Sequence, residues 1–339
     1  MKTDFFSIMA IMGLCFASAV MSSCKGGMNS NEKLLQVKEQ DSLLEEELQT
    51  SPERALVLVD SLAAIHEEDS VRFAYYRALA YNKLGDKKKQ EVWCMRALEG
   101  DVLQNQNVEY FYHACDMLSV ALTYKDDYQG SLAVSQRGFE VAKEDLTDTG
   151  RYWLAVLLHT VGYSEMRLGR IGEAERNFSQ AYIALKQLAG SSHQYKNVFM
   201  LARVSYNIVD AYTGTGQYDK AKAWIDSAED ALDMLAEEPE CTRQQEEEFR
   251  GGLAIQRAMV MMGLGQETEA DRAYHEALGM KYYANTDVGL IERAVFLEKA
   301  QRWEELKELM PRMDSLSKAW GIPMPVIPDE VLQQDEKQE

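Results

Sequence analysis

The sequence predicts an all-α protein, a right-handed α-solenoid of about six to seven helical hairpins. Two observations support this fold class. The segment 161–181 has the pattern of two helices joined by a tight turn at Gly169, with small residues in both helices and Phe178 between them. The same pattern recurs along most of the chain, and no alternating strand pattern competes with it. Self-similarity of this kind is the sequence signature of stacked helical hairpins.

The hairpins follow one another in a common frame. The first is indicated by Ser51-Pro52, because proline is well placed in the first turn of a helix. Later turns, each followed by small or apolar residues at regular offsets, are predicted at Gly85, Asp126, Gly169, Gly216, Gly265 and Gln301. The first of these offsets holds Ala55, Gln90, Ser131, Ala174, Ala221, Ala270 and Leu306. Their spacing of 35 to 49 residues predicts long helices in the middle units, with wide loops at 190–192 and 237–239.

In this frame the residues resemble the tetratricopeptide repeat (TPR). That repeat has a small residue in its first helix, a glycine turn, and then alanine, an aromatic residue and alanine in its second helix. The resemblance covers about Lys33 to Trp320, and 33–320 is therefore predicted to be the TPR solenoid. It implies a concave face, lined by the first helix of each hairpin, that binds partners. The family's clamp for a peptide carboxy terminus does not transfer, since Tyr206 and Asp210 stand where lysine and asparagine would be needed.

Helical phase identifies candidate partner-binding residues on this concave face. Tyrosine and arginine are frequent among them. These residue types often dominate binding energy, and arginine can bind a carboxylate through two hydrogen bonds. The alternative is that such side chains bond neighbouring helices to one another. The candidates are Arg72, Tyr75, Tyr76, His113, Asp116, His159, Tyr163, Arg167, Arg203, Tyr206, Asn207 and Asp210.

Residues 1–23 resemble a bacterial lipoprotein signal peptide. An apolar run of about 16 residues precedes Ser22-Ser23-Cys24, and a small-residue pair before cysteine resembles the lipoprotein processing site. The resemblance implies acylation of Cys24, with 24–32 as a flexible tether. A transmembrane anchor is the alternative, but a spanning helix needs roughly 20 apolar residues. The chain resembles Bacteroidetes lipoproteins, whose surface export is associated with an acidic cluster after the cysteine. That cluster is missing here, so we expect a periplasm-facing protein rather than one on the cell surface.

The C-terminal segment 321–339 is predicted to be a disordered tail. Three of the six prolines stand in 321–328, and no helix tolerates that density of proline. Two alternatives remain open for this segment. It is either a strap that caps the last hairpin or an extended stretch that binds a partner.

Composition argues against several function classes. A net charge of −19 disfavours binding to nucleic acid or a polybasic contact with anionic lipid. The histidines are scattered, and the sequence has no zinc-protease pair, phosphate loop or nucleophile elbow. We therefore expect no enzyme, no cofactor and no metal site. Cys94 and Cys115 fit as buried small hydrophobic residues, with a bridge between neighbouring helices as the alternative.

Together these features predict a membrane-tethered scaffold or adaptor of the cell envelope that binds a protein or peptide through its concave face. Two alternatives stay open. Similar repeat domains precede histidine-kinase modules in Bacteroidetes sensors, so one alternative is a sensory partner of such a kinase. The other is a glycan-uptake lipoprotein. This last class is less favoured, because the gaps between the repeats are short and no exposed tryptophan platform is evident.

Overall fold

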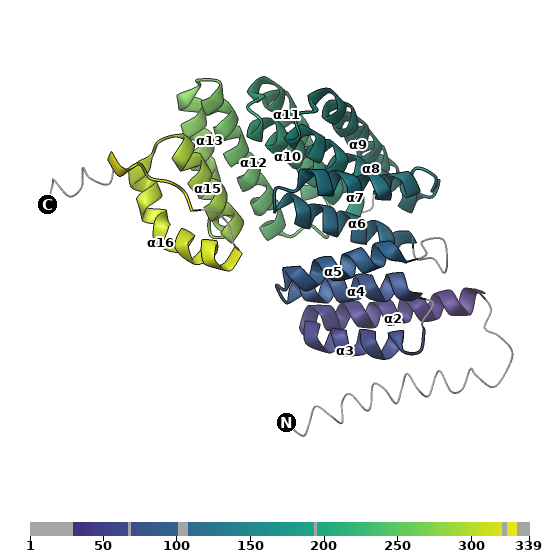
Figure 1. Cartoon of the computed structure of the whole chain (residues 1–339). Coiled ribbons are helices and arrows are strands. Elements are labelled where there is room, and N and C mark those ends of the chain that lie inside the picture. The colour runs from purple at the N-terminus through teal and green to yellow at the C-terminus, as the bar shows by residue number, and fades with distance from the viewer. Residues whose placement is uncertain (1–29, 67–68, 101–107, 193–194, 321–323, 331–339) are drawn as a thin grey trace, which may run out of the picture. The chain divides into compact units, whose positions relative to one another are not determined.

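The computed structural model describes residues 30–66, 69–100, 108–192, 195–320 and 324–330, and most of them are helical (Figure 1). These ranges contain fifteen helices, α2 to α16, and no strand. None of the helices is both long enough and apolar enough to cross a bilayer. The predicted signal peptide and Cys24 lie outside the described residues. The predicted all-α class is confirmed.

The chain divides into two compact units, an N-terminal unit up to Tyr110 and a C-terminal unit from Phe111, which we describe separately. In the N-terminal unit, Leu44, Val59 and Phe73 belong to one hydrophobic cluster and are at most 1% exposed. The unit contains two hairpins, which are α2 (Ser30–Thr50) with α3 (Pro52–Ala63), and α4 (Ser70–Lys83) with α5 (Lys87–Glu99).

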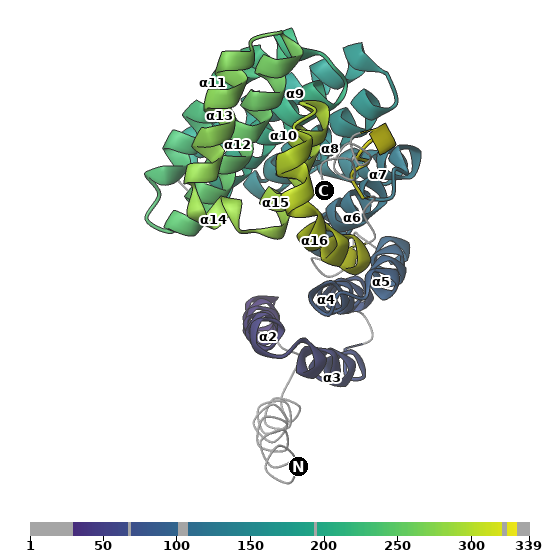
Figure 2. The same ribbon diagram turned by 90° about the vertical axis from the view of Figure 1, so that its left-hand side faces the viewer.

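The C-terminal unit begins within the first turn of α6 and contains five further hairpins within the described residues (Figures 1 and 2). First helices of successive hairpins pack on one another, α8 on α10, α10 on α12 and α12 on α15. Second helices pack between them, as α9 does between α8 and α10. The pairs are α6 (Val108–Thr123) with α7 (Tyr128–Ala142), α8 (Asp148–Arg167) with α9 (Ile171–Ser192), α10 (Tyr195–Gly214) with α11 (Tyr218–Ala236), α12 (Arg243–Gly263) with α13 (Glu267–Gly279), and α15 (Asp287–Lys299) with α16 (Trp303–Trp320). A short helix, α14 (Lys281–Ala284), precedes α15.

All six predicted turns lie where the chain reverses between the two helices of a hairpin. The residue at each turn has a positive φ, a conformation that glycine adopts without a steric penalty from Cβ. The φ angles are 74° at Gly85, 78° at Gly169, 73° at Gly216 and 72° at Gly265. Asp126 and Gln301 take the same conformation with φ of 58° and 55°. The repeat is therefore present in the backbone conformation of the turns as well as in the sequence.

The predicted small positions of the second helices are all buried. The seven residues at the first offset, from Ala55 to Leu306, are at most 4% exposed. In the first helix of the best copy of the repeat, a Cβ on Gly162 would lie 2.8 Å from the Phe178 ring. Close packing of this kind leaves no room for one more carbon atom. The small residues thus set how closely the helices approach each other.

The wide spacing of the middle repeats comes mainly from long helices. Helices α8 to α12 have 19 to 22 residues each. The loop predicted at 237–239 is present, because α11 ends at Ala236. The loop predicted at 190–192 is wrong, since α9 continues to Ser192. One glycine costs a helix about 1 kcal/mol, and burial of Leu185, Leu188 and Ala189 on the same helix outweighs this cost.

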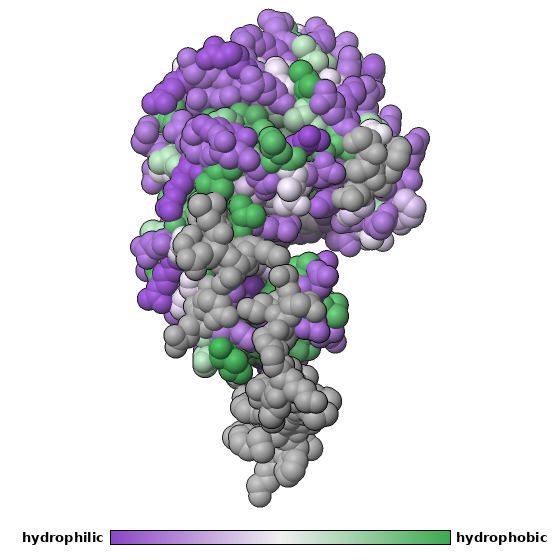
Figure 3. Space-filling model, turned by 90° about the vertical axis from the view of Figure 1, so that its right-hand side faces the viewer, coloured by the Kyte–Doolittle hydropathy of each residue, from purple (hydrophilic) through white to green (hydrophobic). Residues whose placement is uncertain are grey.

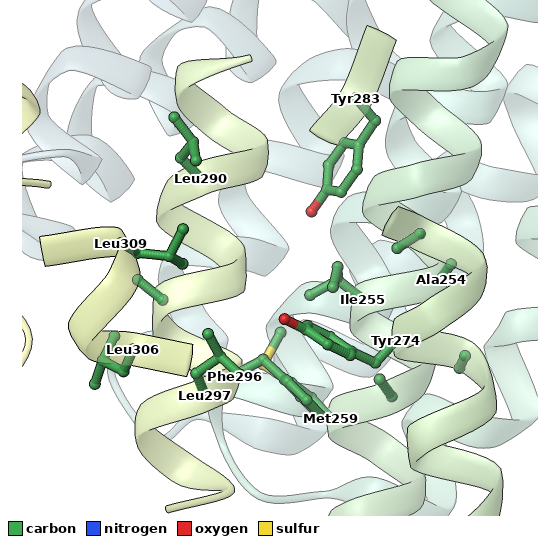
Figure 4. Packing of buried hydrophobic residues seen from close by; sticks show 14 of the residues in the cluster. Ala254, Ile255, Met259, Tyr274, Tyr283, Leu290, Phe296, Leu297, Leu306 and Leu309 are labelled. Atoms are coloured by element: carbon green, nitrogen blue, oxygen red, sulfur yellow. The ribbon is translucent and has the colours of Figure 1, made fainter. Parts of the chain in front are cut away.

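The C-terminal unit has a large hydrophobic cluster near its end, shown in Figure 4. Met324 and Ile327 pack against this cluster, and the backbone N–H of Val326 donates to Glu298 Oε1 over 3.2 Å. For Met324 to Ile327 these contacts match the strap alternative rather than a disordered tail. Residues 321–323 and 331–339 lie outside the described residues.

Two alanine substitutions test the assignment of turn and helix. Gly216→Ala should lower the free energy of unfolding by about 1–2 kcal/mol, because a left-handed backbone penalises Cβ. Gly190→Ala should raise it by about 0.5–1 kcal/mol, because Gly190 is helical and a Cβ there meets nothing within 4 Å. Urea unfolding monitored by circular dichroism measures both. Equal effects of the two substitutions would contradict the assignment.

Candidate partner-binding face

The first helices of the C-terminal unit form one face, which we call the inner face. Its curvature is evident from one contact, in which the Tyr206 hydroxyl of α10 donates to Glu292 Oε1 of α15 over 2.5 Å. These helices belong to alternate hairpins, with α12 between them. Side chains can meet across an intervening helix only on the inside of a curved stack. Gly251 and Gly252 of α12 make this possible, because a Cβ on either would crowd Tyr283 or Tyr206.

One part of the inner face is a network of carboxylates and tyrosines. Glu292 accepts a second hydrogen bond, from the Tyr283 hydroxyl at 2.6 Å. Asp210 accepts from the Tyr163 hydroxyl at 3.2 Å and from Gln256 Nε2 at 2.9 Å. Burial raises the pKa of both carboxyl groups, and the charge of Asp210 raises the pKa of Glu292 further. Because α8, α10, α12, α14 and α15 all contribute, the network ties the inner face together.

A second part of the inner face has polar groups without partners. Among the described residues, Asp116 of α6 and Arg203 and Asn207 of α10 make no hydrogen bond and no ion pair within 4 Å. Burial raises the pKa of Asp116, and the nearby charge of Arg203 partly opposes this rise. We call these three residues the unpaired set. All three keep part of their surface exposed, so a ligand can reach them.

The lack of partners is unusual for this chain. A charged group that loses water normally needs a partner, because an uncompensated charge in a recess is costly. Four of the other five half-buried arginines in the described ranges have an ion-pair partner; they are Arg77, Arg250, Arg257 and Arg302. The other half-buried aspartates there also have one; they are Asp41, Asp86, Asp145 and Asp210. The unpaired set is therefore available to a bound molecule.

Two histidines lie close to the unpaired set and are neutral at pH 7. Burial, and then the charge of Arg203, lower the pKa of His159 to about 3. Burial, and then the charge of Lys196, lower the pKa of His113 to about 4, and its ring stands edge-on to Trp153 with centroids 4.4 Å apart. The Nε2 atom of His159 is buried and has no hydrogen-bond partner in the described part of the chain.

Half-buried aromatic rings line α10 and α12 toward their N-terminal ends. The rings of Tyr195 and Phe199 have centroids 5.7 Å apart, and those of Phe199 and Phe249 are 5.4 Å apart. Phe199 is one helical turn before Arg203, so it lies on the same side of α10. We call Tyr195, Phe199 and Phe249 the aromatic rim. They place apolar surface beside the unpaired set.

Most residues predicted for the binding face lie on the inner face of the C-terminal unit. Among them Tyr163, Tyr206 and Asp210 belong to the network, and Arg203 and Asn207 belong to the unpaired set. Arg167 is exposed, and its Nη2 donates to the Tyr128 hydroxyl over 2.7 Å. His113 and His159 flank the unpaired set. The part played by these residues in binding stays a prediction.

The three predicted residues of the N-terminal unit have a different environment. Arg72 is 1% exposed and donates to Asp41 Oδ1 at 2.8 Å and to Asp69 Oδ2 at 3.3 Å. The Tyr75 and Tyr76 rings contact each other, with centroids 5.2 Å apart, and both contact Tyr110. These side chains therefore join neighbouring helices, which is the alternative to partner binding that the sequence left open.

Sequence reasoning missed Gln256, Glu292 and Tyr283. A signal existed for the first two. Gln256 stands nine positions before Gly265, and Glu292 nine before Gln301, the same offset that Asn207 has before Gly216. No comparable signal existed for Tyr283, because α14 is an insertion outside the repeat frame. The described residues contain no group of three or more metal-binding side chains. Cys94 and Cys115 are both buried, and they form no disulfide with each other.

Comparisons with known proteins agree on the fold. No protein-family model and no curated protein sequence matches the chain. The apo form of RapI is similar with a TM-score of 0.55 and 14% identity, over 81% of this chain and 94% of RapI. A Rap protein complexed with Competence and Sporulation Factor has a TM-score of 0.54 and 15% identity, over 81% and 72%. BtubC from P. vanneervenii has a TM-score of 0.50 and 17% identity, over 71% and 92%. The predicted solenoid of TPR-like hairpins is confirmed.

Paired substitutions test whether Arg203 lacks an internal role. Arg203→Met should leave the free energy of unfolding unchanged within about 0.5 kcal/mol, or raise it, because no internal bond is lost. Arg72→Met should lower it by about 3–5 kcal/mol, because Asp41 and Asp69 lose their partner. Urea unfolding of the full chain measures both values. Similar losses in the two variants would show that Arg203 has a structural partner after all.

Proposed function

We propose that the protein is a lipid-tethered scaffold of the cell envelope that holds a peptide or protein segment on the inner face of its C-terminal unit. The observation that supports this most directly is the unpaired set, since folding alone gives these groups no partner. A bound segment would supply the missing hydrogen bonds and the missing counter-charges.

The chemistry of the inner face favours binding over catalysis. Asp116, Arg203 and Asn207 include no serine, threonine or cysteine nucleophile. His113 and His159 have pKa values far below neutral, and a general base works best when its pKa is near the working pH. Long packed helices present these groups on a rigid surface, so little ordering entropy opposes binding.

Two further features support the proposal. The fold is similar to that of a Rap protein solved in complex with Competence and Sporulation Factor, so a fold of this kind can hold a bound factor. On the face shown in Figure 3, hydrophilic side chains cover much of the described surface.

Site-directed photocrosslinking in intact cells tests the binding face. A photoreactive benzoylphenylalanine at Asn207 should crosslink a discrete partner, while the same probe at the exposed Gln180 of α9 should not. The Arg203→Glu substitution, combined with the probe at Asn207, should abolish the product. Identical products from both positions, or a product that persists in the Arg203→Glu chain, would contradict the proposal.

The tether has a separate test. Cys24→Ala should move the protein from the membrane fraction to the soluble fraction, because acylation at Cys24 would be lost. Cys241→Ala is the matched control and should stay with the membrane. If both variants fractionate like the wild type, the chain is held at the membrane by something other than a lipid on Cys24.

A further inference from the structure

We infer that the inner face selects an extended segment with two opposite charges a few residues apart, a carboxylate for Arg203 and a cationic side chain for Asp116. The segment also carries an apolar side chain next to its carboxylate residue, and this apolar side chain packs on the aromatic rim. This inference rests on the proposed function, which it deepens by naming the chemistry of the partner.

The two charged groups lie on first helices on either side of α8. Asp116 belongs to α6 and Arg203 to α10, with α8 as the first helix between them. Val156 of α8 has the same place in the repeat frame as Arg203, each thirteen positions before its turn glycine, and is 2% exposed. Asp116 and Arg203 are more than 4 Å apart, yet near enough for Arg203 to affect the carboxylate electrostatically. A segment that binds both groups therefore has to pass over α8.

A partner with charges of both signs satisfies the inner face better than a partner with one. An acidic segment alone would pair with Arg203 but would remove water from Asp116 without compensation. A basic segment alone would do the same to Arg203. The chain also has a net charge of −19, which disfavours a purely acidic partner at long range. A segment that brings one charge of each sign avoids these costs.

Asn207 and the aromatic rim set the direction of the segment. The Asn207 amide is both donor and acceptor, so it can bond the N–H and C=O of an extended backbone. It follows Arg203 by one turn on α10, and Phe199 precedes Arg203 by one turn. Phe199 and Phe249 are half-buried and stack edge to face, which leaves ring surface for one apolar side chain. The apolar residue therefore stands next to the acidic residue rather than next to the basic one.

Selection from a random library of displayed 12-residue peptides tests the inference with the full chain as bait. Peptides selected by the wild type should contain an apolar residue beside an acidic one, with a basic residue a few positions away. The best synthetic peptide should bind Arg203→Gln at least about 30-fold more weakly, since truncating a hydrogen-bonded charge pair costs that much or more. Arg176→Gln, at an exposed arginine of α9, is the matched control and should bind with unchanged affinity.

The double variant Asp116→Arg/Arg203→Asp gives the sharper result. It should select peptides in which a basic residue now stands beside the apolar one. Circular dichroism of each variant verifies that it folds, and Arg203→Gln retains the test if the double variant does not. Peptides that bind the inner face without the charge pair, or an unchanged selection by a folded double variant, would overturn the inference alone. If no peptide is enriched, or the enriched peptides ignore every substitution on the inner face, the proposed function fails with it.

Discussion

The close approach of helices through small side chains is the constraint on which the rest of the structure depends. Gly162, Ala174 and Ala181 let one hairpin form, and Gly251 and Gly252 let tyrosines from two other helices cross α12. Larger residues at these places would push the helices apart. Without the close approach, Tyr206 could not reach Glu292, and the first helices would not form one continuous inner face.

On the inner face, some polar groups are hydrogen-bonded to other residues of the chain, and the groups of the unpaired set are not. The network around Asp210 and Glu292 joins helices of four hairpins through hydrogen bonds, so it resists flattening of the stack. That rigidity matters for Arg203 and Asn207 of the unpaired set, which lie on α10 together with Tyr206 and Asp210 of the network. Groups held in place before a ligand arrives lose little entropy on binding. The network thus makes the unpaired groups more effective without contacting a ligand itself.

The fold could be predicted from the sequence because the repeat pattern depends on residue types with a local structural role. Glycine at Gly85, Gly169, Gly216 and Gly265 marks a backbone conformation, and alanine at Ala174 or Ala221 marks a packed contact. It was insufficient at 190–192, where the burial of a whole helix face overrode a local turn signal. It also gave no account of Tyr283, whose position depends on an insertion and on space left by Gly251.

For the binding face, phase predicts where a side chain points but not whether it is already bonded. Arg72 and Arg203 show this most clearly, because each stands thirteen positions before the glycine of its own turn. Arg72 meets Asp41 and Asp69 and is 1% exposed, whereas Arg203 meets no acid within 4 Å and stays partly exposed. The difference comes from acids on other helices, Asp41 on α2 for Arg72 and a distant Asp116 for Arg203. An unpaired arginine is therefore not a general consequence of this repeat position. Arg203 differs from Arg72 because the helices around it supply no acidic partner. Its charge is therefore free to pair with a ligand.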